Sequence, residues 1–168
     1  LKGPMTTPEE TGAPISAAVQ IRTMLNLYAN VRPVQSRPGV KGIHGNVDLI
    51  IVRENTEGMY KGLESRIGEN ALAIRVITRR ASERIARFAF ELARQQNRKK
   101  VTIVHKANVL KQTCGVFRES CLNVSKEYPE IQSEELIVDA AALKLVMQPQ
   151  DLDVIVTTNL FGDILSDE

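Results

Sequence analysis

The stretch DLDVIVTTNLFGDILSDE, residues 151–168, guides the interpretation of the whole chain. It begins with the largely apolar run DLDVIVTT, which is typical of a buried strand. Asp163 and Asp167 follow at a spacing of four residues, so a helix would place both carboxylates on one face. A buried strand leading directly into a helix with two acidic side chains indicates a sheet protein with a polar site where the strand ends.

Strand and helix patterns alternate along the rest of the sequence. Continuous apolar runs predict further strands, and apolar residues spaced by three and four predict helices. This alternation is typical of the α/β class. Residues 57–78 alternate between glycines and short strand-like runs, which predicts a protruding hairpin. The other predicted strands are 47–55, 99–108 and 135–140, the predicted helices are 15–31, 81–97, 110–128 and 141–149, and 32–47 is predicted as loop or short strand.

Composition excludes several classes of protein. The 168 residues are 43% hydrophobic and 25% charged, which is ordinary for a globular domain. A formal net charge of +2 with dispersed basic residues argues against nucleic acid as a partner. No apolar run reaches the length of a membrane span and no export signal is visible, so we expect no membrane partner and an intracellular location. Cys114 and Cys121 lie seven residues apart within a predicted helix, too far for a disulfide, and are expected to be buried free thiols.

Polar residues gather at the predicted carboxyl ends of the strands, where α/β proteins bind ligands. Arginines can hold carboxylates through paired hydrogen bonds, and aspartates can hold a hard divalent cation through oxygen. Together they predict a site for an anionic, metal-chelating small molecule. The strand-end residues are Arg53, Lys106, Asn108, Asp139, Asp163 and Asp167, and the arginines upstream are Arg22 and Arg32.

Each of these residues also has an ordinary structural explanation. Asp163 and Asp167 can be acids of a first helical turn, which the helix dipole favours. Arg22 can belong to a solvated helix face, and Tyr60 can simply pack within the hairpin. Asp139 at a strand end can form a turn as readily as it can bind a metal. The residue types and spacings alone therefore do not identify a reaction.

Five segments, in this order along the chain, resemble those of a known enzyme family. They are LYANVRPV (27–34), DLIIVRENTEGMY (48–60), VHKANVLK (104–111), LIVDA (136–140) and DVIVTTNLFGDILSD (153–167). The family is the metal-dependent β-decarboxylating dehydrogenases that act on isocitrate, homoisocitrate and isopropylmalate. The resemblance covers the whole chain but only about the middle half of a family member. It implies a partial three-layer α/β/α sheet of the isopropylmalate dehydrogenase type.

The resemblance also implies a division into domains and a shared site. Residues 1–28 are expected to belong to the large cofactor domain, and 29–168 to form the small substrate and dimerisation domain with an arm near 58–78. In the family the lysine and the first of three aspartates reach into the partner subunit's site. The active unit is therefore expected to be a homodimer, using Mg²⁺ or Mn²⁺ with NAD, or NADP.

The resemblance assigns a role to each candidate residue, and the roles together describe oxidation and decarboxylation of a polycarboxylic acid. Asn108 would face both the substrate and the nicotinamide. The carboxylate clamps would be Arg22, Arg32 and Arg53, the acid/base pair Tyr60 and Lys106, and the metal ligands Asp139, Asp163 and Asp167.

The segment before Arg22 bears on the choice of substrate. Isocitrate enzymes carry a serine six residues before the first clamp arginine, which contacts the extra carboxylate, and Ser16 occupies that position here. Isocitrate is therefore the predicted substrate. Ala18 replaces the asparagine that those enzymes often have, which keeps homoisocitrate open, and Ile15 and Val19 leave room for isopropylmalate.

Three further expectations concern assembly and activity. The hairpin and the apolar stripe from Leu110 to Val124 are the candidates for the subunit interface, with ordinary core as the alternative for both. A non-catalytic regulatory subunit or a dimerising fragment is the alternative from another functional class. The 168 residues alone are expected to be inactive because the family's adenosine-binding segment is missing, and the location is expected to be cytoplasm, or the matrix of a mitochondrion.

Overall fold

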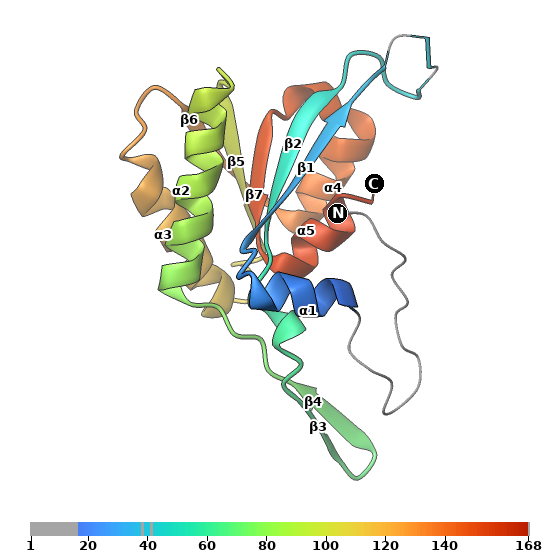
Figure 1. The fold of residues 1–168 in the computed structure, drawn as a ribbon, viewed down its shortest axis with the longest axis vertical. Coiled ribbons are helices and arrows are strands. Elements are labelled where there is room, and N and C mark those ends of the chain that lie inside the picture. The colour runs from blue at the N-terminus through green and yellow to red at the C-terminus, as the bar shows by residue number, and fades with distance from the viewer. Residues whose placement is uncertain (1–16, 38, 41, 168) are drawn as a thin grey trace.

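The computed structural model describes residues 17–37, 39–40 and 42–167, which form a five-stranded sheet with helices on both faces (Figure 1). The strand order is β1-β2-β7-β5-β6. β1 runs antiparallel to β2, and the other neighbouring pairs are parallel. The bounds are β1 Ala29–Gln35, β2 Asp48–Glu54, β5 Lys100–His105, β6 Gln132–Ile137 and β7 Val154–Thr157.

The three central strands β2, β7 and β5 are buried on both faces, each face being covered by a pair of helices. α2 (Arg79–Gln95) and α3 (Thr113–Ser125) cover one face, and α4 (Val138–Met147) and α5 (Asn159–Leu165) cover the other. Ile50 and Val52 of β2 join the first core, whereas Leu49 and Ile51 join the second, as the alternation of side chains along a strand requires. The predicted three-layer α/β/α architecture is therefore confirmed.

The predicted arm is also present. We call residues 58–78 the arm; they contain a single 3-10 turn, η1 (Met59–Lys61), and the hairpin β3 (Glu64–Ile67) and β4 (Asn70–Ala73). Every residue of the two strands is exposed, and Figure 1 shows the hairpin projecting away from the sheet. Gly68 has φ 61° at the tip, a conformation that glycine adopts without strain. The assignment of 1–28 and 29–168 to different domains stays a prediction.

Several element boundaries differ by a few residues from the sequence-based expectation, and two of the differences bear on the site. The helix predicted over 15–31 is α1 (Ala17–Met24), and Asn26 with φ 47° turns the chain into β1. The Leu27 amide donates to the Arg22 carbonyl at 2.9 Å, a hydrogen bond of the kind that closes helix C-termini. β6 passes into α4 without a loop, so Asp139 lies in the first helical turn rather than at the strand end.

The apolar stripe from Leu110 to Val124 lies mostly in the core of the single chain, and only Leu110 at its start is exposed, at 37%. Phe117 and Cys121 of α3 are 1% and 0% exposed and belong to the core cluster that α2 and the sheet share. The alternative of ordinary core is therefore correct, because the helical spacing identified a buried face without indicating which element covers it. Cys114 and Cys121 are buried free thiols, as predicted.

Among the described residues, no helix combines the length and the apolar character that crossing a membrane would require.

Candidate active site

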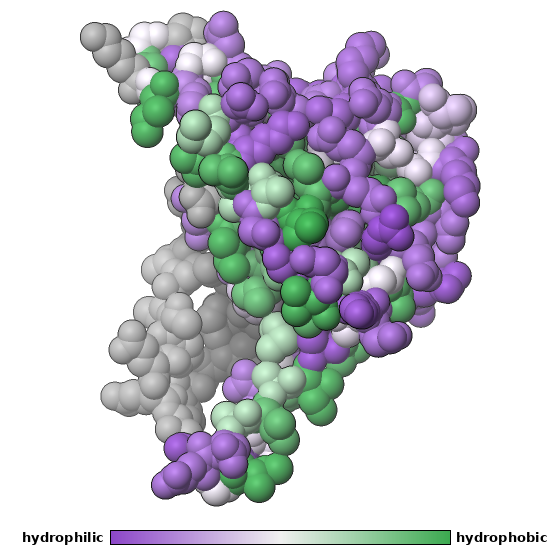
Figure 2. Space-filling model, turned by 180° about the vertical axis from the view of Figure 1, so that it is seen from behind, coloured by the Kyte–Doolittle hydropathy of each residue, from purple (hydrophilic) through white to green (hydrophobic). Residues whose placement is uncertain are grey.

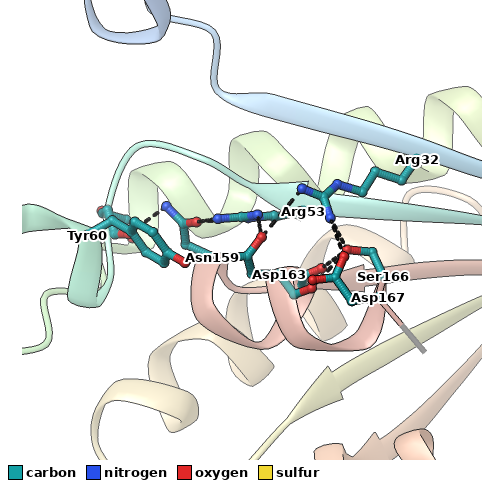
Figure 3. A network of polar contacts seen from close by, with 9 residues as sticks. Arg32, Arg53, Tyr60, Asn159, Asp163, Ser166 and Asp167 are labelled. Carbon is teal, nitrogen blue, oxygen red and sulfur yellow. Dashed lines mark hydrogen bonds and ion pairs between the residues drawn. The ribbon is translucent and has the colours of Figure 1, made fainter. Parts of the chain in front are cut away.

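Arg53 is the centre of a polar network where β2 meets α5 (Figure 3). It is 2% exposed, and its guanidinium Nε and Nη2 donate to Asn159 Oδ1 at 2.9 and 2.7 Å. The Nη1 atom forms an ion pair with Asp163 Oδ1. Every nitrogen of this buried guanidinium therefore has an acceptor, as a charge removed from water requires.

Arg32 extends the network to the second aspartate of α5. Its Nη2 lies 3.4 Å from Asp163 Oδ1, and its Nη1 lies 3.6 Å from Asp167 Oδ1 and donates to Ser166 Oγ. Arg32 thus contacts two carboxylates, and one of them, Asp163, is also paired with Arg53. The structure confirms that Arg32, Arg53, Asp163 and Asp167, which sequence reasoning grouped, lie together.

Tyr60 reaches the same carboxylate from the arm. Its phenol donates to Asp163 Oδ2, and its ring lies under the Arg53 guanidinium with 5.1 Å from Cζ to the ring centroid. Burial, followed by the hydrogen bond and the negative charge of Asp163, raises the pKa of Tyr60 above its ordinary value. Burial also acts to raise the pKa of Asp163, but the Tyr60 phenol and the charges of Arg53 and Arg32 outweigh it, so that pKa is lowered. Near neutral pH the pair is therefore a neutral phenol and an ionised carboxylate.

A cavity of about 220 Å³ opens beside this network. Among the described residues that line it, three are cationic, none is acidic, and none is aliphatic. The predicted clamps Arg22 and Arg53 both line it, as does Tyr60. Such a lining favours a ligand with more than one negative charge. The lining residues are Arg22, Asn26, Arg53, Asn55, Thr56, Tyr60, Lys61 and Asn159.

Lys106 and Asp139 form a separate pair. Lys106 follows β5, and its Nζ forms an ion pair with Asp139 Oδ1 in the first turn of α4. The hydrogen bond from Lys106 lowers the pKa of Asp139. The described lining of the cavity includes neither Lys106 nor Asp139. Asn108, two residues after Lys106, is exposed. One chain therefore does not bring these three residues to the Arg53 network, and Ser16 lies outside the described residues.

The described residues contain no group of three acidic, histidine or cysteine side chains able to hold a metal ion within one chain. Asp163 and Asp167 nevertheless form half of a suitable donor set. Both contact the Arg32 guanidinium, so both lie around one position of positive charge. Carboxylate oxygens are the ligands that Mg²⁺ and Mn²⁺ prefer. These residues fit a divalent cation, provided that another chain supplies further oxygen ligands.

Sequence reasoning missed several residues that shape the site, among them Lys61 in the cavity lining and two residues of α5. Asn159 is 2% exposed and anchors Arg53. Gly162 lies where α5 crosses β2 so closely that a Cβ atom there would be 2.7 Å from both Cβ and Cγ of Arg53. A glycine inside a helix pattern, directly before a candidate metal ligand, was the available signal for close packing. Nothing in the sequence pointed to Asn159, because its partners lie more than 100 positions away.

The whole chain, residues 1–168, matches the family model described as isocitrate/isopropylmalate dehydrogenase. The 3-isopropylmalate dehydrogenase of Archaeoglobus fulgidus is 54% identical over 158 residues, which are 94% of this chain and 48% of the relative. A mitochondrial regulatory subunit of the NAD isocitrate dehydrogenase of Dictyostelium discoideum is 49% identical over 99% of the chain and 47% of its own length. The crystal structure of isocitrate dehydrogenase from Methylococcus capsulatus superposes with a TM-score of 0.93 at 54% identity, covering 99% of this chain and 50% of that one. The chain thus spans about half the length of the curated relatives it matches.

Proposed function

The chain belongs to the isocitrate/isopropylmalate dehydrogenase family, and we propose that it forms the substrate- and metal-binding part of an enzyme that oxidatively decarboxylates a 2-hydroxy polycarboxylic acid. The observation that carries this proposal is the cavity whose described lining has three cationic side chains and no acidic one. Two of its lining residues, Arg53 and Tyr60, contact Asp163. Its positive lining suits carboxylates, and the adjacent aspartates suit the cation that a hydroxy acid chelates.

Each residue of the network then has a task. Arg22, Arg32 and Arg53 orient the substrate by its carboxylates, which places the reacting carbon in a fixed position. Tyr60 is a neutral phenol near pH 7 and can donate its proton to the carbon from which CO₂ has departed. Lys106 of a second subunit would accept the proton of the substrate hydroxyl.

A divalent cation and the nicotinamide complete the chemistry. Asp163 and Asp167, with Asp139 of a second subunit, would hold Mg²⁺ or Mn²⁺, which lowers the pKa of a coordinated hydroxyl and polarises a ketone, while NAD or NADP would accept the hydride. The position of Asp163 between two guanidinium groups and a phenol supports this assignment, because the carboxylate is held in place before any cation arrives.

The partner that supplies Lys106 and Asp139 is proposed to be a second copy of this chain. Asp139, Leu143, Val146 and Met147 lie at positions i, i+4, i+7 and i+8 of α4 and therefore share one helix face. The three apolar residues are exposed, at 64%, 51% and 62%, and Ile164 of α5 adds to them at 51%. Figure 2 shows hydrophobic surface over this side of the body and along the arm. A second copy docked on this face would cover the apolar residues. It would also bring Asp139 of each copy close to Asp163 of the other.

Isocitrate is the favoured substrate, because Ser16 stands six residues before Arg22 and a solved structure 54% identical carries the name isocitrate dehydrogenase. Isopropylmalate is the second candidate, since a relative 54% identical carries that name, and homoisocitrate is the third. The test is a spectrophotometric assay of NADH or NADPH formation by the full-length protein with each acid, with and without a chelator. We expect turnover of isocitrate that the chelator abolishes. Faster turnover of isopropylmalate would refute the substrate choice, and no turnover of any of the three would refute the reaction.

A candidate from another class is a non-catalytic regulatory subunit, because the relative from Dictyostelium discoideum carries that name. Tyr60, Lys106 and the three aspartates are all present here, which argues for catalysis. A protein that is inactive alone but lowers the KM of a catalytic partner would favour the regulatory role.

A further inference from the structure

Asn159 connects two parts of the molecule through one buried amide. Its Oδ1 accepts both hydrogen bonds from the Nε and Nη2 edge of Arg53, at 2.9 and 2.7 Å, and its Nδ2 donates to the Glu57 carbonyl at 3.1 Å. Figure 3 shows the amide in line between the guanidinium and the segment that precedes the arm. With 2% of Asn159 and 2% of Arg53 exposed, few water molecules can replace these bonds.

Glu57 in turn joins the two ends of the arm. Its carboxylate accepts from the Thr78 amide at 2.8 Å and from the Thr78 hydroxyl at 2.9 Å. The same hydroxyl accepts from the Ala81 amide at 3.2 Å and so caps α2. The Glu57 backbone is thereby held next to Thr78, at the point where the arm begins and ends. Asn159 connects this backbone to Arg53 through its amide.

We propose that Asn159 is a positioning residue. It fixes the plane of the Arg53 guanidinium toward the substrate cavity and couples the position of that guanidinium to the backbone of Glu57, where the arm begins. The inference rests on the proposed function and deepens it. The Asn159 Oδ1 atom accepts hydrogen bonds from both Nε and Nη2 of Arg53. These two bonds allow the guanidinium only one orientation, in which Nη1 points at Asp163. A planar guanidinium held on one edge can donate its remaining hydrogens to a substrate carboxylate and loses little side-chain entropy when it does so.

The kinetic consequence follows from where Arg53 acts. A clamp on a carboxylate that does not react binds ground state and transition state alike, so its loss raises KM and leaves kcat nearly unchanged. In the full-length protein, Asn159→Ala is expected to raise the KM for the substrate about 10- to 100-fold, because two hydrogen bonds to a charged group are lost. The kcat is expected to stay within about threefold of the wild type, provided that the carboxylate held by Arg53 stays intact through the reaction. A purely structural role would lower thermal stability or the active fraction and leave KM unchanged.

A second readout does not depend on activity. Hydrogen exchange of the Arg53 Nε–H, followed by nitrogen-15 NMR of the same protein, is expected to be slow in the wild type and fast in Asn159→Ala. Asn159→Asp keeps the acceptor for both bonds, so it should retain slow exchange even if the alanine variant fails to fold. Asn123→Ala is the matched control, since Asn123 is an exposed asparagine on α3 and its loss should change neither quantity.

Fast exchange of the Arg53 Nε–H in the wild type or in Asn159→Asp, or an alanine variant with unchanged KM and unchanged exchange, would overturn the inference. A wild type without dehydrogenase activity would refute the proposed function instead, and the exchange measurement alone would then decide the role of Asn159.

Discussion

Replacing Gly162 by alanine tests the close approach of α5 to β2 directly. The new Cβ would lie 2.7 Å from Cβ and Cγ of Arg53 and 3.1 Å from Cγ2 of Thr157. Carbon atoms pack at about 3.5–4.0 Å, so the helix would have to move outward by roughly 0.8 Å or more. Arg53 is unable to yield, because it is held by Asn159 and Asp163 and its backbone belongs to a central pair of strands.

Two opposing terms set the size of the effect. Overpacking of this kind costs about 1–3 kcal/mol, whereas alanine in place of a helical glycine contributes about 0.5–1 kcal/mol in the stabilising direction. We therefore expect Gly162→Ala to lower the free energy of unfolding by about 1–2 kcal/mol, and the melting temperature by about 2–8 °C. Because Asp163 follows directly in the chain, its displacement by about 1 Å should reduce kcat/KM by about 100-fold.

Gly115→Ala provides the matched comparison. Gly115 also lies within a helix, α3, but nothing approaches within 4 Å of a Cβ built there. The substitution should therefore stabilise the protein by about 0.4–1 kcal/mol. Far-UV circular dichroism during heating or urea titration measures both variants. A Gly162→Ala protein as stable as Gly115→Ala would refute the claim that this contact excludes a side chain.

Three further changes test the core and the ion pairs. A thiol reagent should leave Cys114 and Cys121 unlabelled in the native protein and label both in urea, because both are buried and burial raises the pKa of Cys121; rapid native labelling would contradict this. Phe117→Asp should give unfolded or insoluble protein rather than a soluble monomer, since emptying such a site alone costs about 3–5 kcal/mol; a folded monomer in size-exclusion chromatography would return the stripe to the interface. The pKa of Asp163 lies below its ordinary 3.8, so the folded state loses the benefit of its ion pairs as pH falls through that range. Urea unfolding of wild type and Asp163→Asn should therefore differ most near pH 7 and converge only as pH falls below the ordinary 3.8, and a difference independent of pH would argue against a lowered pKa.

The sequence predicted best those helices and strands whose apolar pattern is set by burial alone. β2 and β5 are buried on both faces, so their apolar runs are continuous, and α2 has one buried face with the expected spacing. The helix over 15–31 was predicted too long because Leu25, Tyr28 and Val31 continue a helical rhythm while the chain already turns at Asn26. Local spacing does not register a change of backbone conformation at one residue.

The residue types in the sequence predicted several of the residues that belong to the candidate site. They did not predict which of these residues contact one another. Arg53, Asp163 and Tyr60 could be grouped because each stands at or near the end of an element. Which of them touch, and that Asn159 holds one of them, depends on pairs separated by more than 100 positions. The separate position of Lys106 and Asp139 follows from the sheet order, in which β5 and β6 lie beyond β7. Assembly with a second copy remains a proposal.

The exposed hairpin β3–β4 offers a way to detect whether another molecule covers it. A two-stranded ribbon is only marginally stable by itself, so β3 and β4 should open locally and admit a protease. Arg66 in β3 is exposed and offers trypsin a cleavage point. The fragments 1–66 and 67–168 would stay together after the cut, since β2 from one is paired with β7 from the other. Protection of this bond at high protein concentration would report that the hairpin had been covered by another molecule.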